Sequence, residues 1–202
     1  MRRVSHWFVA LAAVVGLLQI AARAAEQEQM VNNPPYVHWS AFRPGTTVTQ
    51  RERVLFAKGS DEADYYAAGA RVHDSTYKLL EVTPKHVVVQ MTIFEHGPGS
   101  VTEHAPVKIT YHATADKARV FGGREEIEKF KEGEEEVKVI DKTVKAHLVD
   151  IVDIDGDETV ERKIWESNEI PGGIVKEVKK TKKGNKVVAE TITHVLEFHV
   201  EK

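Results

Sequence analysis

The sequence predicts a mainly β protein: a single highly curved antiparallel sheet, open or forming a half barrel, with one short helix. Apolar and polar residues alternate over most of the chain after residue 45, which is typical of half-buried strands. In the last third of the chain the segments between them are short and contain Gly or Asp, which favours antiparallel hairpins. The last alternating segment is long, and a long strand requires a twisted sheet. A two-sheet sandwich is the alternative architecture.

The first 24 residues have the three parts of a secretory signal peptide, expected as a helix ahead of the sheet. Two arginines come first, an apolar run of about 14 residues follows, and residues 22–24 form a small-x-small peptidase site. Cleavage is therefore expected between Ala24 and Ala25. The run is shorter than the roughly 20 residues of a membrane-spanning helix. The protein is expected to be exported, periplasmic or secreted, without a membrane span after cleavage; an uncleaved anchor is the alternative.

The remainder is predicted to form one domain. Residues 25–35 are polar and end in two prolines, which indicates a flexible lead-in, and the β domain is expected over 36–202. The chain has no cysteine, which excludes a small disulfide-framework fold. The net charge is −3, or −6 without the three arginines of residues 1–24. Charges of both signs are interspersed, so no nucleic-acid partner is expected.

The predicted elements begin with two aromatic residues. Trp39 and Phe42 are three residues apart, so one helical turn would place both against an end of the core. Nine strands are then expected, over residues 46–56, 70–83, 87–94, 107–113, 134–140, 143–154, 158–166, 174–181 and 186–200. A short helix is expected over 123–131, because Ile127 and Phe130 share one side, glutamates lie in the first turn and lysines lie in the last. This helix and the aromatic residues are expected to cover the concave face of the sheet.

Metal-binding patterns are absent from the sequence. Five acidic residues surround Gly156, but their spacing does not fit a calcium loop, so a hairpin with solvated acids is predicted. The ten histidines include no pair at the close spacing of a zinc motif. No metal site is expected.

Catalytic patterns are equally sparse. The chain has no cysteine nucleophile, no Gly-x-Ser-x-Gly turn and no glycine-rich phosphate loop. Glu190 and His194 lie on the apolar face of the last strand, where a structural hydrogen-bonded pair, a polar point in a cavity and an acid–base unit are the alternatives. The sequence predicts that the protein is not an enzyme and has neither catalytic residues nor a cofactor.

Three short motifs carry a family resemblance. They are Trp39-x-x-Phe42-x-x-Gly45, the segment 133–137 that opens the C-terminal strands, and Trp165 with the Pro-Gly-Gly-Ile-Val-Lys turn at 171–176. With these motifs the chain resembles small exported proteins of planctomycete-type bacteria. More distantly, it is similar to curved-sheet periplasmic domains such as the lipoprotein carriers LolA and LolB. That similarity implies an apolar concave pocket for an acyl chain or a lipoprotein.

Two binding hypotheses follow. In the first, the concave face binds a lipid, another apolar ligand or a protein partner. The residues expected to line it are Val89, Met91, Ile109, Leu196 and Phe198, with His194 as a polar point. In the second, the core is filled and the protein has a structural or interaction role in the cell envelope. An exposed apolar patch near Trp39 or Trp165 would favour this alternative.

Overall fold

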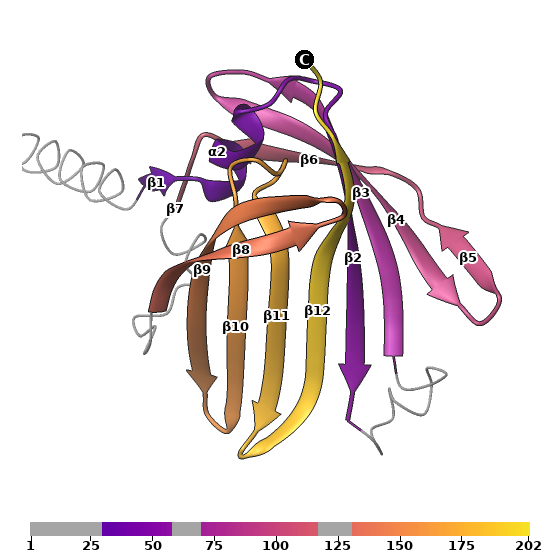
Figure 1. Cartoon of the computed structure of the whole chain (residues 1–202), viewed down its shortest axis with the longest axis vertical. Helices are drawn as coiled ribbons and strands as arrows, with labels where there is room; N and C mark the ends of the chain where they lie inside the picture. Colours follow the sequence, from indigo (N-terminus) through magenta and orange to yellow (C-terminus); the bar gives the residue numbers. More distant parts are fainter. Residues whose placement is uncertain (1–29, 58–69, 117–130) are drawn as a thin grey trace, which may run out of the picture.

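Figure 1 shows the computed structural model, which describes residues 30–57, 70–116 and 131–202. The elements of these residues are β1 (Met30–Asn32), α2 (Pro34–Ser40), β2 (Thr47–Phe56), β3 (Ala70–Val82), β4 (His86–Gly97), β5 (Ser100–Glu103), β6 (Val107–His112), β7 (Thr114–Asp116), β8 (Lys131–Val139), β9 (Lys142–Asp155), β10 (Glu158–Glu166), β11 (Ile174–Lys183) and β12 (Lys186–His199). The prediction of a mainly β fold with a large antiparallel sheet and a short helix is confirmed.

The main sheet contains ten strands, all paired antiparallel. Its order is β5-β4-β3-β2-β12-β11-β10-β9-β8, and β6 pairs with the first half of β4. Most neighbours are consecutive hairpins, but β2 pairs with β12 at the centre, where the first and last long strands meet. β1 and β7 form a separate two-stranded sheet. The described strands leave two edges of the main sheet unjoined, so the sheet is open, as predicted.

The sheet is strongly curved at one edge. β8 contacts β12 although β9, β10 and β11 lie between them in the sheet order. Figure 1 shows the β8–β9 hairpin passing across the sheet near the α2 end. Val139, Val144 and Ala146 of this hairpin are buried in the core cluster. The curvature therefore serves to bury the apolar side of a strand that lies at the sheet edge.

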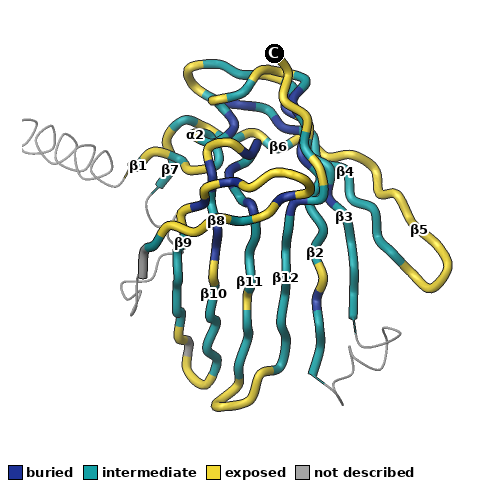
Figure 2. Tube along the Cα trace, viewed as in Figure 1, coloured by how far each residue is buried: buried dark blue, intermediate teal, exposed yellow. Residues whose placement is uncertain are grey.

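The core is concentrated at the α2 end of the sheet. Trp39 of α2 belongs to the same buried cluster as Val48, Val87 and Val89. We refer to the side of the sheet that carries these valines as the α2 face, and to the other side as the opposite face. Figure 2 shows that most buried residues lie near α2, while the far parts of β9–β12 are intermediate or exposed. The expected position of Trp39 at one end of the core is confirmed.

Several boundaries differ from the predictions. Regular structure is present from Met30, the first described residue, so residues 30–35 of the expected flexible lead-in 25–35 include a strand and the start of a helix. The short strands β1, β5 and β7 are absent from the predicted elements, since three or four residues give too little alternation to recognise. The predicted helix 123–131 lies outside the described residues except for Lys131, which begins β8. The signal peptide also lies outside them.

The described part of the chain contains no helix that is both long enough and apolar enough to cross a lipid bilayer.

Candidate functional site

A row of paired residues crosses the α2 face beyond the core. Residues that pair directly in an antiparallel sheet point to the same side. The register therefore places one residue from each of six strands in this row: Ile151, Arg162, Lys179, Thr191, Val54 and Arg71. Two pockets lie along it, one polar and one largely apolar, and Arg162 lines both. The row gives the site a polar end on β3 and an apolar end on β9.

The polar pocket has a volume of about 670 Å³. It is lined by Glu52, Val54, Phe56, Arg71, Arg162, Glu177, Lys179, Thr191 and Thr193. Alternation along the strands brings these side chains to one face, where charged and hydroxyl groups outnumber the apolar Val54 and Phe56. The pocket can therefore hold a polar or charged group.

The charges of the polar pocket are unevenly paired. Arg162 donates a hydrogen bond from Nε to Oε1 of Glu177 at 2.9 Å, and Glu52 Oε1 lies 3.7 Å from His73 Nε2. In contrast, Arg71 has no hydrogen bond or ion pair with the described residues, and its Nε is buried. One guanidinium thus lines the pocket without a counter-ion from the described part of the chain.

The apolar pocket is larger, with a volume of about 1220 Å³. On one side it is formed by β9 and β10, which contribute Val149, Ile151 and Ile164. On the other side are the residues around β1, the start of α2 and β7, including Met30 and Pro34. α2 therefore plugs the core with Trp39 at its end and walls this pocket with its first turn.

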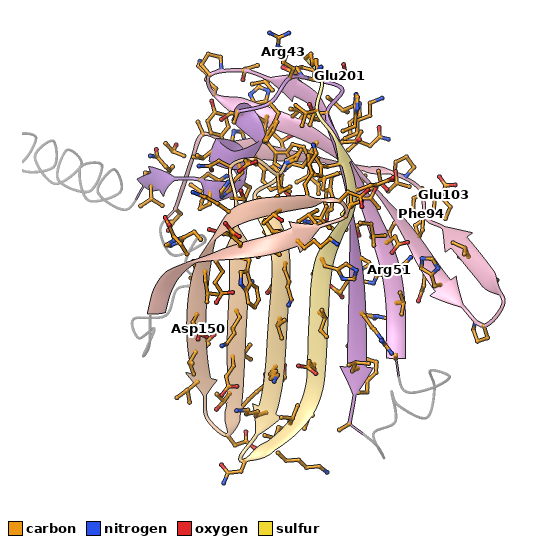
Figure 3. All side chains as sticks on the ribbon, in the orientation of Figure 1. Arg43, Arg51, Phe94, Glu103, Asp150 and Glu201 are labelled. Carbon is orange, nitrogen blue, oxygen red and sulfur yellow. The ribbon has the colours of Figure 1, made fainter. Side chains whose placement is uncertain are left out.

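A separate polar cluster lies on the opposite face. Arg51 donates to both carboxylate oxygens of Asp74, from Nε to Oδ1 at 2.7 Å and from Nη2 to Oδ2 at 2.9 Å. His96 Nε2 lies 2.9 Å from Oδ2 of the same carboxylate. The hydrogen bonds from Arg51 and, after them, from His96 hold the pKa of Asp74 below its ordinary value, although burial opposes this. Figure 3 labels Arg51 on β2, with Phe94 and Glu103 of the same cross-strand row toward the sheet edge.

The pKa of His194, which pairs with Arg51 across β12 and β2, is also perturbed. Burial lowers it first, and the charges of Arg51 and Lys176 lower it further, while Asp74 acts in the other direction. His194 is thus favoured in its neutral form. A neutral imidazole beside a paired Arg–Asp couple is a structural arrangement that avoids placing another cation there.

The predicted ligand-binding residues do not all share a face. Val89, Met91, Ile109 and Phe198 lie on the α2 face, but His194 lies on the opposite face. The reason is a bulge in β12 between residues 195 and 197, which reverses the alternation. Leu196, half-buried, is the extra residue of that bulge. The predicted single apolar side for Leu196, Phe198 and His194 is therefore wrong.

The acid–base unit of Glu190 and His194 is not formed. Glu190 Oε1 lies 3.4 Å from Lys180 Nζ. Its distance from His194 is set by four residues of strand, about 13 Å along the backbone. In the described residues, no group of three or more His, Cys, Asp and Glu side chains is arranged to hold a metal ion.

Sequence reasoning missed the residues that line the two pockets. Arg71, Lys179 and Ile151 sit on different strands, and only the register shows that they lie in one row. The sequence does carry one signal of the site, which is a break in the apolar face. The start of β3 and the middle of β11 carry basic residues on the face that is apolar elsewhere, and such interruptions mark where a core ends.

Comparisons with known proteins find a distant structural likeness. No family model matches the chain, and no curated protein has a significantly similar sequence. Among solved structures, the chain is similar to the S-type phycobiliprotein lyase CPES from Guillardia theta. The two are 12% identical, the match covers 83% of this chain and 90% of that chain, and the TM-score is 0.28. A likeness at this TM-score carries no argument about function.

The prediction that the protein is not an enzyme is corrected by this comparison. The similar solved structure is that of a lyase, and the absence of familiar catalytic motifs from a sequence does not by itself exclude catalysis. The same likeness assigns no reaction to this chain. The prediction of a non-enzymatic protein is withdrawn.

Proposed function

We propose that the protein binds a small, largely apolar molecule in the apolar pocket of the α2 face. The observation that carries the proposal is the pocket itself, about 1220 Å³ beside a core that is otherwise closely packed. Ligand pockets are typically concave, mostly apolar and a few hundred to about a thousand Å³ in volume. The pocket walled by β9, β10 and the α2 region has these properties.

The alternative of an interaction surface around the tryptophans receives no support. Trp39 and Trp165 are only 4% and 9% exposed, so neither forms an apolar patch on the surface. The core near α2 is filled, with Val87 and Val89 fully buried. The structure thus combines a filled core at one end of the α2 face with an open pocket at the other.

A titration with the neutral apolar dye Nile red tests this function. The wild-type chain is expected to bind the dye with a rise in fluorescence. Ile151→Gln should weaken binding several-fold, because it places an amide in the apolar wall. Ile154→Gln is the matched control, since Ile154 lies on the same strand, points to the other face and is 51% exposed. A wild-type chain that does not bind the dye, or equal losses in both variants, would refute the proposal.

The proposal includes export. Residues 1–24 have the composition of a signal peptide, and the binding domain would then act outside the cytoplasm. The mass of the protein recovered from its own host tests this part separately. A chain that begins at Ala25 is the expected result, and a chain that retains residues 1–24 would contradict it.

A further inference from the structure

Arg71 occupies an unusual position in the polar pocket. It lies on β3 and pairs across the sheet with Val54, which is buried. The Nε atom of Arg71 is buried without a hydrogen-bond partner, and the side chain has no ion pair with the described residues. The guanidinium is therefore partly withdrawn from water while its charge remains uncompensated by the described part of the chain.

Such a cation is costly unless an anion accompanies it. Burial of a charge without a partner is unfavourable, and buried donors normally find acceptors. Neither carboxylate of the pocket forms an ion pair with Arg71: Glu177 accepts from Arg162, and Glu52 Oε1 lies 3.7 Å from His73 Nε2. Lys179, which also lines the pocket, has no ion pair with the described residues. The pocket lining thus carries three basic side chains, Arg71, Arg162 and Lys179, against two carboxylates, Glu52 and Glu177.

We infer that the polar pocket binds the anionic group of an amphipathic ligand through Arg71, and that the apolar part of this ligand extends past Arg162 into the apolar pocket. This inference rests on the proposed function and specifies the ligand class, a long apolar chain that ends in a single oxyanion. A guanidinium presents a planar fork of donors that matches a carboxylate or a phosphate. Lys179 adds a second positive charge at the exposed mouth of the pocket.

The distance along the cross-strand row indicates how long a fitting ligand would be. Arg71 and Ile151 stand at the two ends of the cross-strand row, on β3 and β9. With β2, β12, β11 and β10 between them, they are five strand spacings apart. Five spacings measure about 24 Å on a flat sheet and less on a curved one. A long alkyl chain fits this span, whereas a short acid would reach only the polar pocket.

Competition with Nile red tests the inference with three ligands: hexadecanoic acid, its methyl ester and hexadecyl phosphate. In the wild-type protein, the acid or the phosphate should bind about tenfold more tightly than the ester, the usual size of a charge-assisted contact. Preference for the acid over the phosphate would identify a carboxylate site, and the reverse a phosphate site. Arg71→Gln should abolish the preference over the ester while leaving the affinity for the ester and for Nile red unchanged.

Arg53→Gln is the matched control. Arg53 is next to Val54 on the same strand, is exposed and points to the opposite face. It removes the same charge from the protein without touching the pocket, so the preference for the anionic ligand should survive. Lys179→Gln should reduce this preference less than Arg71→Gln, because Lys179 is exposed.

The outcomes separate the inference from the proposed function. If Nile red and the ester bind but the anionic ligands have no advantage, the inference is overturned and the apolar site stands. Equal effects of Arg53→Gln and Arg71→Gln would overturn the inference in the same way. If neither Nile red nor any of the three ligands binds the wild-type protein, both the proposed function and the inference fail.

Discussion

A side chain at position 173 would collide with His38. A Cβ atom built on Gly173 lies 2.5 Å from Cγ and Nδ1 of the His38 ring, and Gly173 has φ of +83°. The turn before β11 thus approaches α2 so closely that only glycine fits. A Cβ atom built on the neighbouring Gly172, with φ of +80°, would lie 3.2 Å from Cε2 and Cζ2 of the Trp39 ring. This contact fixes how α2 sits on the core.

Gly173→Ala is therefore expected to destabilise the protein more than an ordinary glycine replacement. Left-handed backbone costs an alanine roughly 1 kcal/mol, and displacement of a packed ring adds about 1–3 kcal/mol. Gly184→Ala is the matched control, because Gly184 has φ of +56° and open space around its Cα. Urea unfolding of both variants measures the difference. His38→Ala in the Gly173→Ala background should recover part of the loss; equal losses at the two glycines would show that the collision is relieved without cost.

The same contact illustrates what could be predicted from the sequence. The Pro-Gly-Gly segment at 171–173 predicts a turn, and Trp39 predicts an aromatic plug, because both depend on local chemistry. The contact between this turn and Trp39 depends on long-range packing. A local sequence pattern does not predict such packing. The long strands can also be predicted from local sequence. The alternation of apolar and polar residues in β2, β4 or β10 indicates that one face of each strand is buried.

Side-chain placement fails where alternation breaks. The bulge at Leu196 inserts one residue into β12, so every residue beyond it changes face relative to His194. Nothing in the sequence of β12 marks this position, because Val195, Leu196 and Phe198 are all apolar. The pocket row is hidden for another reason: Arg71 and Ile151 are joined by register across six strands, and register is a property of the assembled sheet.

The Arg51–Asp74 pair predicts a specific loss of stability in acid. The folded protein holds the pKa of Asp74 below its ordinary value, so the carboxylate contributes its full stabilisation above the unfolded value of about 4. This contribution is lost as the pH falls through the lowered pKa of the folded state. Asp74→Asn should lower the free energy of unfolding at neutral pH by about 1 kcal/mol, a modest figure because Arg51 is 38% exposed to screening water.

Urea unfolding at a series of pH values checks this prediction. Asp74→Asn should also flatten the fall in stability at acidic pH, because the titrating group is removed. Asp157→Asn, at the exposed tip of the β9–β10 hairpin, should leave the pH profile close to that of the wild type. An unchanged acid profile in Asp74→Asn would mean that other carboxylates dominate acid unfolding.

Trp165 links the β8–β9 hairpin to the sheet. Its indole Nε1 donates to Oε2 of Glu135 at 2.7 Å, and Lys176 Nζ lies 4.8 Å from the ring centroid. Glu135→Ala should lower the free energy of unfolding by about 1 kcal/mol, since a buried indole donor loses its acceptor. Glu135→Gln keeps an acceptor and should recover most of this loss. Glu136→Ala provides the control at an adjacent exposed position.

A double-mutant cycle with Trp165→Phe isolates the hydrogen bond from other effects of the two substitutions. The coupling energy should equal most of the loss seen in Glu135→Ala. A coupling near zero would show that the hairpin is held by its buried valines alone, such as Val139 and Val144.

Substitution of Val89 tests whether the ligand contacts the core or only the pocket. The sequence predicts that it contacts a ligand, but its side chain is 0% exposed in the core cluster and does not line either of the two pockets. Val89→Ala should lower the free energy of unfolding by about 2 kcal/mol through lost burial and a cavity. Val101→Ala, at a valine that is 59% exposed, should change it by less than about 0.5 kcal/mol.

Nile red affinity of the same variants completes the test. The affinity of folded Val89→Ala protein should match that of the wild type, because Val89 lies in the core cluster and lines neither pocket. A variant that keeps its stability but loses affinity would instead place the ligand over the core residues of β4. In that case Val89, Met91 and Ile109 would form the site after all, and the cluster that contains Trp39 and Val89 would have to open for the ligand to enter.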